Sequence, residues 1–324
     1  MIFIHVMSKT YRLILFGVLC MLFSNVVVRG EEKIFVESPL FDSLREGERG
    51  AILMVHFGTT HDDTRVRTLD ALNHAVGTAF PGIELCEAYS SRIVCKRLRD
   101  RGIEKLSPME AMDKLRAEGV THLLIVPSQV IYGLEMKALE QEVEQRRGDF
   151  REIRLTTPLL FYEKDYRELI DRVLVPLAKD RDTAYLLVGH GTYDSSTAQY
   201  AMLDHYLMDR GLSQIIVGCI EGYPYYDQAL RRLRATGLRR VCLMPLMMVA
   251  GEHAKHDISD EWATALRDAG YEVTVDARGL GELPEVQEMV VERARFFAHY
   301  RRLLIGEKKK IYEKTGVKLS AEDE

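Results

Sequence analysis

The chain reads AILMVHFGT at residues 51–59 and returns to nearly the same string, AYLLVGHGT, at residues 184–192. In both places an apolar run ends in a turn that contains glycine and threonine. A second apolar run with a proline and a later glycine follows each string, at residues 126–135 and 244–253. Self-similarity at this distance is typical of a duplicated α/β half. Two related halves that face one another would place their strand ends around a shared cleft.

Length and composition agree with two domains of ordinary size. The chain has 324 residues, of which 47% are hydrophobic, so it can bury a sizeable core. The formal net charge is −5, and no stripe of basic residues with interleaved aromatics occurs before the C-terminal tail. Nucleic acid is therefore not expected as a partner.

The first thirty residues form a segment of their own. Lys9 and Arg12 precede an apolar run at residues 13–23, and acidic residues follow Gly30. This pattern predicts a signal peptide over residues 1–30, export to the periplasm, and no stable membrane span after cleavage. The alternative is an uncleaved anchor, because further valines at residues 26–28 lengthen the apolar stretch.

The remaining chain alternates between strand-like and helix-like patterns, which predicts parallel sheets with helical crossovers. We expect an α/β fold with two similar domains, each with a central parallel sheet flanked by helices, at residues 31–160 and 161–305, followed by a charged, solvated tail at 306–324. The predicted strands cover residues 51–56, 83–88, 121–127, 153–158, 184–189, 214–219, 239–245 and 271–275. The predicted helices cover residues 64–79, 90–101, 107–119, 134–147, 163–179, 195–211, 225–236, 257–269 and 284–303.

Three candidate metal ligands follow strands of the second half. His190, Glu221 and His253 each come just after an apolar run, and ligands bind beyond the carboxyl ends of such strands. Two imidazoles and a carboxylate with an open position suit a divalent transition metal. Singly, each residue has a simpler explanation: a histidine at a strand end is often structural, and the glutamate could cap the next helix. No structural explanation accounts for all three together.

Longer strings around these residues resemble one enzyme family. They are GHG at residues 189–191, VGCIEGYP at 217–224 and LMPLMMVAGEHA at 243–254. The chain resembles the anaerobic cobalt chelatases of the CbiK type, the sirohydrochlorin cobaltochelatases, from about residue 51 to residue 297. This resemblance implies a chelatase fold and insertion of Co²⁺ into sirohydrochlorin, with His190, Glu221 and His253 as the metal-binding set. Glu135 matches a carboxylate of the cleft.

The chemistry of metal insertion fits these residue types. Two pyrrole N–H protons leave while the metal sheds ligands, so a base and a metal site must face the same macrocycle. We expect His190 and His253 to present the metal, with His190 also accepting a proton, and Glu221 to complete the ligation. Glu135 would relay protons or orient the macrocycle. Fe²⁺ is an alternative substrate, because this ligand set does not discriminate it from Co²⁺.

The chain also departs from its relatives. Ser128 and Gln129 stand where many relatives have a Leu-His pair, and an amide is a poor substitute for a histidine that ligates haem iron. We therefore do not expect haem. A homo-oligomer is expected. Two other functions remain open: an exported metal or tetrapyrrole carrier that keeps the fold, and a two-domain binding protein for an unrelated ligand. A disulfide between Cys86 and Cys95 also remains open.

Overall fold

The computed structural model describes residues 34–42, 44–251 and 254–316. The predicted signal peptide at residues 1–30 lies outside the described residues. The chain forms two compact units, Ser38–Tyr300 and a second one made of the two chain ends. None of the helices within the described ranges has the length and apolar character that a membrane span requires.

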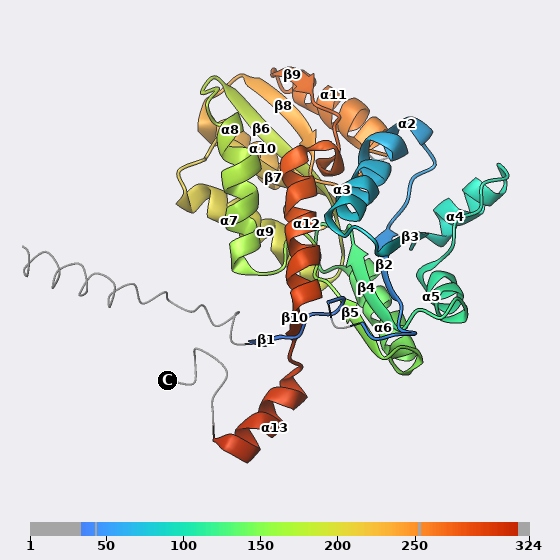
Figure 1. The fold of residues 1–324 in the computed structure, drawn as a ribbon. Helices are drawn as coiled ribbons and strands as arrows, with labels where there is room; N and C mark the ends of the chain where they lie inside the picture. Colours follow the sequence, from blue (N-terminus) through green and yellow to red (C-terminus); the bar gives the residue numbers. More distant parts are fainter. Residues whose placement is uncertain (1–33, 43, 252–253, 317–324) are drawn as a thin grey trace, which may run out of the picture. The chain divides into compact units, whose positions relative to one another are not determined.

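The larger unit contains two four-stranded parallel sheets with the same topology (Figure 1). The strand orders are β3-β2-β4-β5 and β7-β6-β8-β9. In each sheet the first strand in sequence is an inner one, the second pairs with one of its edges, and the third pairs with the other edge. The expected α/β fold with two similar parallel sheets is confirmed. The strands are β2 (Gly50–His56), β3 (Glu84–Tyr89), β4 (His122–Pro127), β5 (Glu152–Leu155), β6 (Thr183–Gly191), β7 (Ile215–Glu221), β8 (Arg240–Pro245) and β9 (Glu272–Val275).

Helices connect successive strands at nearly the expected residues. In the first half they are α2 (Asp62–Arg65), η2 (Val66–Asp70), α3 (Ala71–Ala79), α4 (Arg92–Arg99), α5 (Pro108–Ala117), α6 (Leu134–Arg146) and η3 (Arg147–Asp149). The remaining ones in this unit are α7 (Glu163–Leu169), η4 (Ile170–Leu174), α8 (Val175–Leu177), η5 (Ser195–Thr197), α9 (Ala198–Asp209), α10 (Tyr226–Thr236), η6 (Ala254–Trp262), α11 (Ala263–Asp268), η7 (Leu280–Glu282) and α12 (Pro284–His299).

The inner strands are buried along nearly their whole length. Residues 51–56 of β2 have no solvent exposure, and β6 is buried except at Tyr185 and His190, which are half-buried. Parallel strands covered by helices on both faces read as continuous apolar runs, which explains the two repeated strings. Each sheet packs against its own cluster of apolar side chains, so each half has its own hydrophobic core.

The last helix of the larger unit packs on the first half. Helix α12 follows the second sheet in sequence, but it contacts α3, β4 and β5 (Figure 1). The Arg293 guanidinium donates hydrogen bonds to the carbonyl oxygens of Pro158 and Leu159 and forms a 2.9 Å ion pair with the nearly inaccessible Asp165. The Arg154 guanidinium on β5 donates to the Phe297 carbonyl oxygen of α12 at 2.8 Å. The two halves therefore share α12.

The smaller unit is built from both ends of the described chain. Strand β1 (Phe35–Glu37) pairs with β10 (Tyr300–Arg302), and α13 (Ile305–Thr315) follows. No residue of α13 is buried. The segment expected to be a charged, solvated extension is therefore helical over its first part.

Candidate active site

Two of the three predicted metal ligands lie at adjacent strand ends. His190 is the last residue but one of β6, and Glu221 is the last residue of its neighbour β7. The His190 ring is half-buried, with Nδ1 3.1 Å from the carbonyl oxygen of Gly191, while Glu221 is exposed. His253 lies outside the described residues, but Gly251 follows β8, the strand on the other side of β6. The two described positions, His190 and Glu221, thus belong to the carboxyl edge of one sheet.

Two glycines allow this edge to close tightly. Gly191 has a φ of +82°, and a Cβ atom there would lie 1.4 Å from the carbonyl oxygen of Glu221. A Cβ at Gly189 would lie 2.3 Å from the Tyr200 ring. Only glycine permits both the positive φ and the close backbone approach at position 191. The backbone on both sides of His190 is therefore fixed by close packing against β7 and α9.

Glu135 comes from the first half and begins a helix. It lies in the first turn of α6, where the helix dipole stabilises a carboxylate. The Ser90 hydroxyl donates a 2.6 Å hydrogen bond to Glu135 Oε2, and the Ser90 amide donates to the carbonyl oxygen of His56. The carboxylate is thereby held at the ends of β2 and β3. Sequence reasoning did not identify Ser90, because a serine after a strand carries no distinctive signal.

The start of α6 touches the loop that follows His190. Lys137 Nζ lies 2.6 Å from Asp194 Oδ1, and the Tyr132 amide donates to Gln199 Oε1 at 3.0 Å. The hydrogen bond with the Lys137 ammonium lowers the pKa of the Asp194 carboxyl. Segments that carry Glu135 and His190 are thus in direct contact across the two halves.

Exposed apolar side chains follow several strand ends. The most exposed is Tyr193 (86%), after β6, and four others are 40–52% exposed. Large apolar groups left open to solvent at the ends of parallel strands suit a flat, conjugated ligand, whose faces stack on aromatic rings. The other four are Phe57, Leu134, Tyr223 and Tyr225.

His56 precedes the first turn that contains glycine and threonine, but it is a core residue. Its ring has no solvent exposure and is hydrogen-bonded on both sides, to Ser128 Oγ at 2.8 Å and to Asn73 Oδ1 at 2.9 Å. Asn73 in turn donates to Glu87 Oε2 at 2.9 Å. Burial lowers the pKa of His56, so the folded state favours the neutral ring.

This environment predicts a loss of stability in mild acid. The unfolded chain takes up a proton at His56 near pH 6.5, whereas the folded chain does so only at lower pH. The contribution of neutral His56 to the free energy of unfolding is therefore fully present above pH 6.5 and is lost progressively below it. The slope attributable to one proton is about 1.4 kcal/mol per pH unit. Urea unfolding between pH 7.5 and 5.5 should show a shallower loss in His56→Asn than in the control His74→Gln, which changes an exposed histidine. Equal slopes would contradict the assignment.

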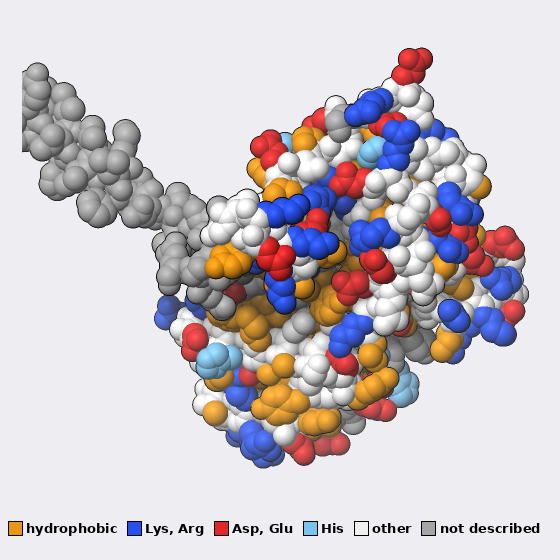
Figure 2. All heavy atoms as spheres, turned by 90° about the horizontal axis from the view of Figure 1, so that it is seen from below, with side chains coloured by type: hydrophobic (Ala, Val, Ile, Leu, Met, Phe, Trp, Pro, Cys, Tyr) orange, Lys and Arg blue, Asp and Glu red, His pale blue; other side chains and the backbone are white. Residues whose placement is uncertain are grey.

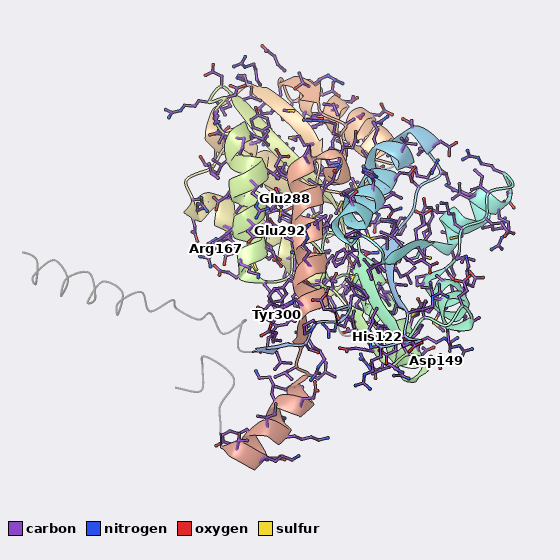
Figure 3. All side chains as sticks on the ribbon, viewed as in Figure 1. His122, Asp149, Arg167, Glu288, Glu292 and Tyr300 are labelled. Carbon is purple, nitrogen blue, oxygen red and sulfur yellow. The ribbon has the colours of Figure 1, made fainter. Side chains whose placement is uncertain are left out.

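Other groups of potential ligands lie elsewhere. Within the described ranges, one set of His, Asp and Glu ligand atoms lies within 4.8 Å of one another, formed by His256, Asp257 and Glu261 on the exposed side of η6. Neither His190 nor Glu221, the two predicted ligands that the structure describes, belongs to it. His122, at the beginning of β4, occupies the amino edge of the first sheet (Figure 3), away from the strand ends that carry His190 and Glu221. A cavity of about 170 Å³ between α7 and α12 is lined by none of the predicted site residues.

Charged side chains of both signs alternate over the surface. Figure 2 shows basic and acidic groups interspersed on one face, with no broad area of one sign. This distribution agrees with the small net charge and gives no electrostatic footprint for a nucleic acid on that face.

Comparison with known proteins gives the family. The family model for cobalt chelatase (CbiK) matches residues 50–297, more than half of the chain. The chain belongs to the CbiK cobalt chelatase family. It is 34% identical to the sirohydrochlorin cobaltochelatase of Salmonella typhimurium over 260 residues, which cover 78% of this chain and 96% of that protein. It is 28% identical to the sirohydrochlorin cobaltochelatase CbiKC of Nitratidesulfovibrio vulgaris, with 71% and 84% of the two chains covered.

Solved structures agree on the fold of this chelatase. SirB from Bacillus subtilis with Fe³⁺ aligns with a TM-score of 0.55 at 14% identity, covering 77% of this chain and 96% of SirB. DR2241 from Deinococcus radiodurans, described as similar to chelatases, aligns with a TM-score of 0.52 at 17% identity, covering 76% and 55%. At these identities the likeness concerns the fold alone.

Two sequence expectations concern residues of the chelatase away from the strand ends of β6 and β7. Gln129 follows β4, and both polar atoms of its amide are buried without a hydrogen-bond partner among the described residues. All four cysteines in the described part of the chain are free thiols, so Cys86 and Cys95 form no disulfide in this structure.

Proposed function

We propose that this chelatase is a sirohydrochlorin cobaltochelatase, which inserts Co²⁺ into sirohydrochlorin with release of two protons. The observation that carries the proposal is the arrangement of His190 and Glu221 at neighbouring strand ends. These are residue types that can bind a divalent metal, in a chain that belongs to the cobalt chelatase family. The names of the two relatives support the substrate and the metal.

The proposed roles follow from the chemistry of each group. Neutral imidazoles of His190 and His253 and the carboxylate of Glu221 bind Co²⁺ and present it to the macrocycle. A neutral imidazole can also accept a proton, so His190 takes up a pyrrole proton as the metal enters. Glu135 accepts the second proton or passes it to solvent. The exposed aromatic side chains give the macrocycle a surface on which to stack.

The finer properties are part of the same proposal. Fe²⁺ is a second possible substrate, because borderline nitrogen and oxygen ligands accept both metals. Residues 1–30 direct the chain to the periplasm, where it forms a homo-oligomer. Haem is not expected at Gln129, whose amide is a weak ligand for haem iron.

Anaerobic absorbance spectroscopy tests the proposal. The chain from residue 31 is mixed with sirohydrochlorin and either Co²⁺ or Fe²⁺, and the rate of metallation is compared with an enzyme-free control. We expect Co²⁺ insertion well above the control rate. A shifted spectrum of bound pigment without metallation would instead indicate a tetrapyrrole carrier, and faster insertion of Fe²⁺ would indicate an iron chelatase.

A further inference from the structure

The contact between α6 and the loop after His190 joins the two halves beside both proposed catalytic groups. Glu135 and Lys137 belong to the first two turns of α6, and Asp194 follows His190 by four residues. Lys137 and Asp194 are 2.6 Å apart, although 57 positions separate them in sequence. The ion pair is thus the charged link between the segment that carries the proposed acid–base carboxylate and the segment that carries the proposed metal ligand.

Asp194 is held firmly in place by its own loop. Its amide donates to Thr192 Oγ1 at 3.1 Å, and its Oδ1 accepts a 3.0 Å hydrogen bond from the Ser196 amide. The carboxylate therefore faces Lys137 in a fixed orientation. The lysine is partly exposed, with 37% of its side chain accessible, whereas Asp194 is 21% accessible.

Two further contacts join the segment before α6 to the residues that follow Asp194. The Tyr132 amide donates to Gln199 Oε1 at 3.0 Å, and a Cβ atom at Gly133 would lie 3.8 Å from Ser196 Oγ. These contacts bring the backbones together but involve neutral groups. Among these contacts between described residues, the ion pair is the one that joins two charged groups, so it adds a Coulombic attraction between α6 and the His190 loop.

We propose that Lys137 and Asp194 are positioning residues for metal insertion: their ion pair fixes the separation between Glu135 and His190. The inference rests on the proposed function. Metal delivery and proton removal must act on one macrocycle at the same time, so the two groups need a defined distance. A misplacement of about 1 Å can lower a rate by about a hundredfold, even when the altered residue lies away from the reacting atoms.

The test removes the charge of one partner of the ion pair and keeps a side chain of similar size. Lys137→Met retains an unbranched side chain, and Asp194→Asn retains an oxygen that can accept from the Ser196 amide, since asparagine is a good helix cap. We expect each variant to lower kcat for Co²⁺ insertion by about tenfold or more, with little change in KM, in Co²⁺ affinity or in Tm. Lys137→Arg, which keeps the charge, should restore most of the activity.

Coupling between the two sites gives a second readout. Because either change alone removes the pair, the double variant Lys137→Met/Asp194→Asn should be no slower than either single variant. Arg146→Met is the matched control: it removes the 3.0 Å hydrogen bond to Asp113 within the first half, at the far end of the same helix. The control should insert cobalt at the normal rate.

Several results would overturn the inference. Unchanged kcat in both single variants, or additive losses in the double variant, would show that the pair does not position the site. A raised KM with normal kcat in Lys137→Met would assign the lysine to substrate binding instead. These outcomes are distinct from a failure of the proposed function, in which the unaltered chain itself would not metallate sirohydrochlorin.

Discussion

Replacement of His190 with alanine is expected to lower the rate of cobalt insertion by at least about a hundredfold, because general acid–base groups contribute rate factors of this size and metal ligation is lost as well. The side chain occupies the end of β6, where the backbone is fixed by the close approach of Gly191 to Glu221. Truncation to alanine leaves that backbone unchanged, so the fold should be retained. Anaerobic single-turnover absorbance, with circular dichroism to confirm folding, measures the effect.

Comparison with Glu135→Gln separates the two proposed roles. His190→Ala should weaken Co²⁺ binding in the absence of pigment, whereas Glu135→Gln should bind Co²⁺ normally and insert it slowly. His205→Ala serves as the control, since this histidine is exposed on α9 and 3.5 Å from Asp209. Normal metallation by His190→Ala would refute the central assignment of the site.

The second large effect concerns stability: Asp165→Ala is expected to lower the free energy of unfolding by about 3–5 kcal/mol, the usual result of removing one partner from a buried ion pair. Asp165 is 2% exposed, and its carboxylate accepts from the amides of Phe161 and Tyr162 at 3.0 and 2.7 Å as well as pairing with Arg293. Its removal takes one acceptor from each of the two amides and the ionic partner from Arg293, which keeps its hydrogen bonds to the Pro158 and Leu159 carbonyl oxygens.

Urea unfolding monitored by circular dichroism measures this loss. Asp165→Asn should be less destabilised than Asp165→Ala, because the amide oxygen can still accept from the backbone. Asp171→Ala is the control, since Asp171 forms a partly exposed ion pair with Arg210 and such pairs contribute about 0–1 kcal/mol. A loss below about 1 kcal/mol in Asp165→Ala would show that the Pro158 and Leu159 carbonyl oxygens are sufficient partners for Arg293.

The sequence predicts the sheets well because their patterns are local. Continuous apolar runs mark buried strands, and each expected strand coincides with an observed one, although β5 ends at Leu155 rather than near residue 158. Glycines at 189 and 191 mark the turn beside His190 in the sequence. The adjacency of His190 and Glu221 is given by the observed strand order, in which β6 and β7 are neighbours.

Other features depend on contacts that no local pattern reports. The amphipathic pattern of residues 284–303 predicts a helix but does not say which sheet it covers, and α12 packs on the first sheet rather than on the second. The burial of His56 depends on Ser128 and Asn73, which are distant in sequence. The ion pair of Lys137 with Asp194 likewise joins different halves. In these cases the structural role of a residue depends on which distant residue it contacts, and the residue type alone does not reveal that contact.

The position of α12 has a consequence for how the chain is made. A ribosome completes the first sheet long before it reaches residues 284–299, so β4 and β5 emerge without the helix that later packs on them. Until then Asp165 has no Arg293 to pair with, and Arg154 has no Phe297 carbonyl to bind. The first sheet therefore lacks the helix that covers β4 and β5 until nearly the whole chain has been synthesised. Native packing is reached late and for both halves together.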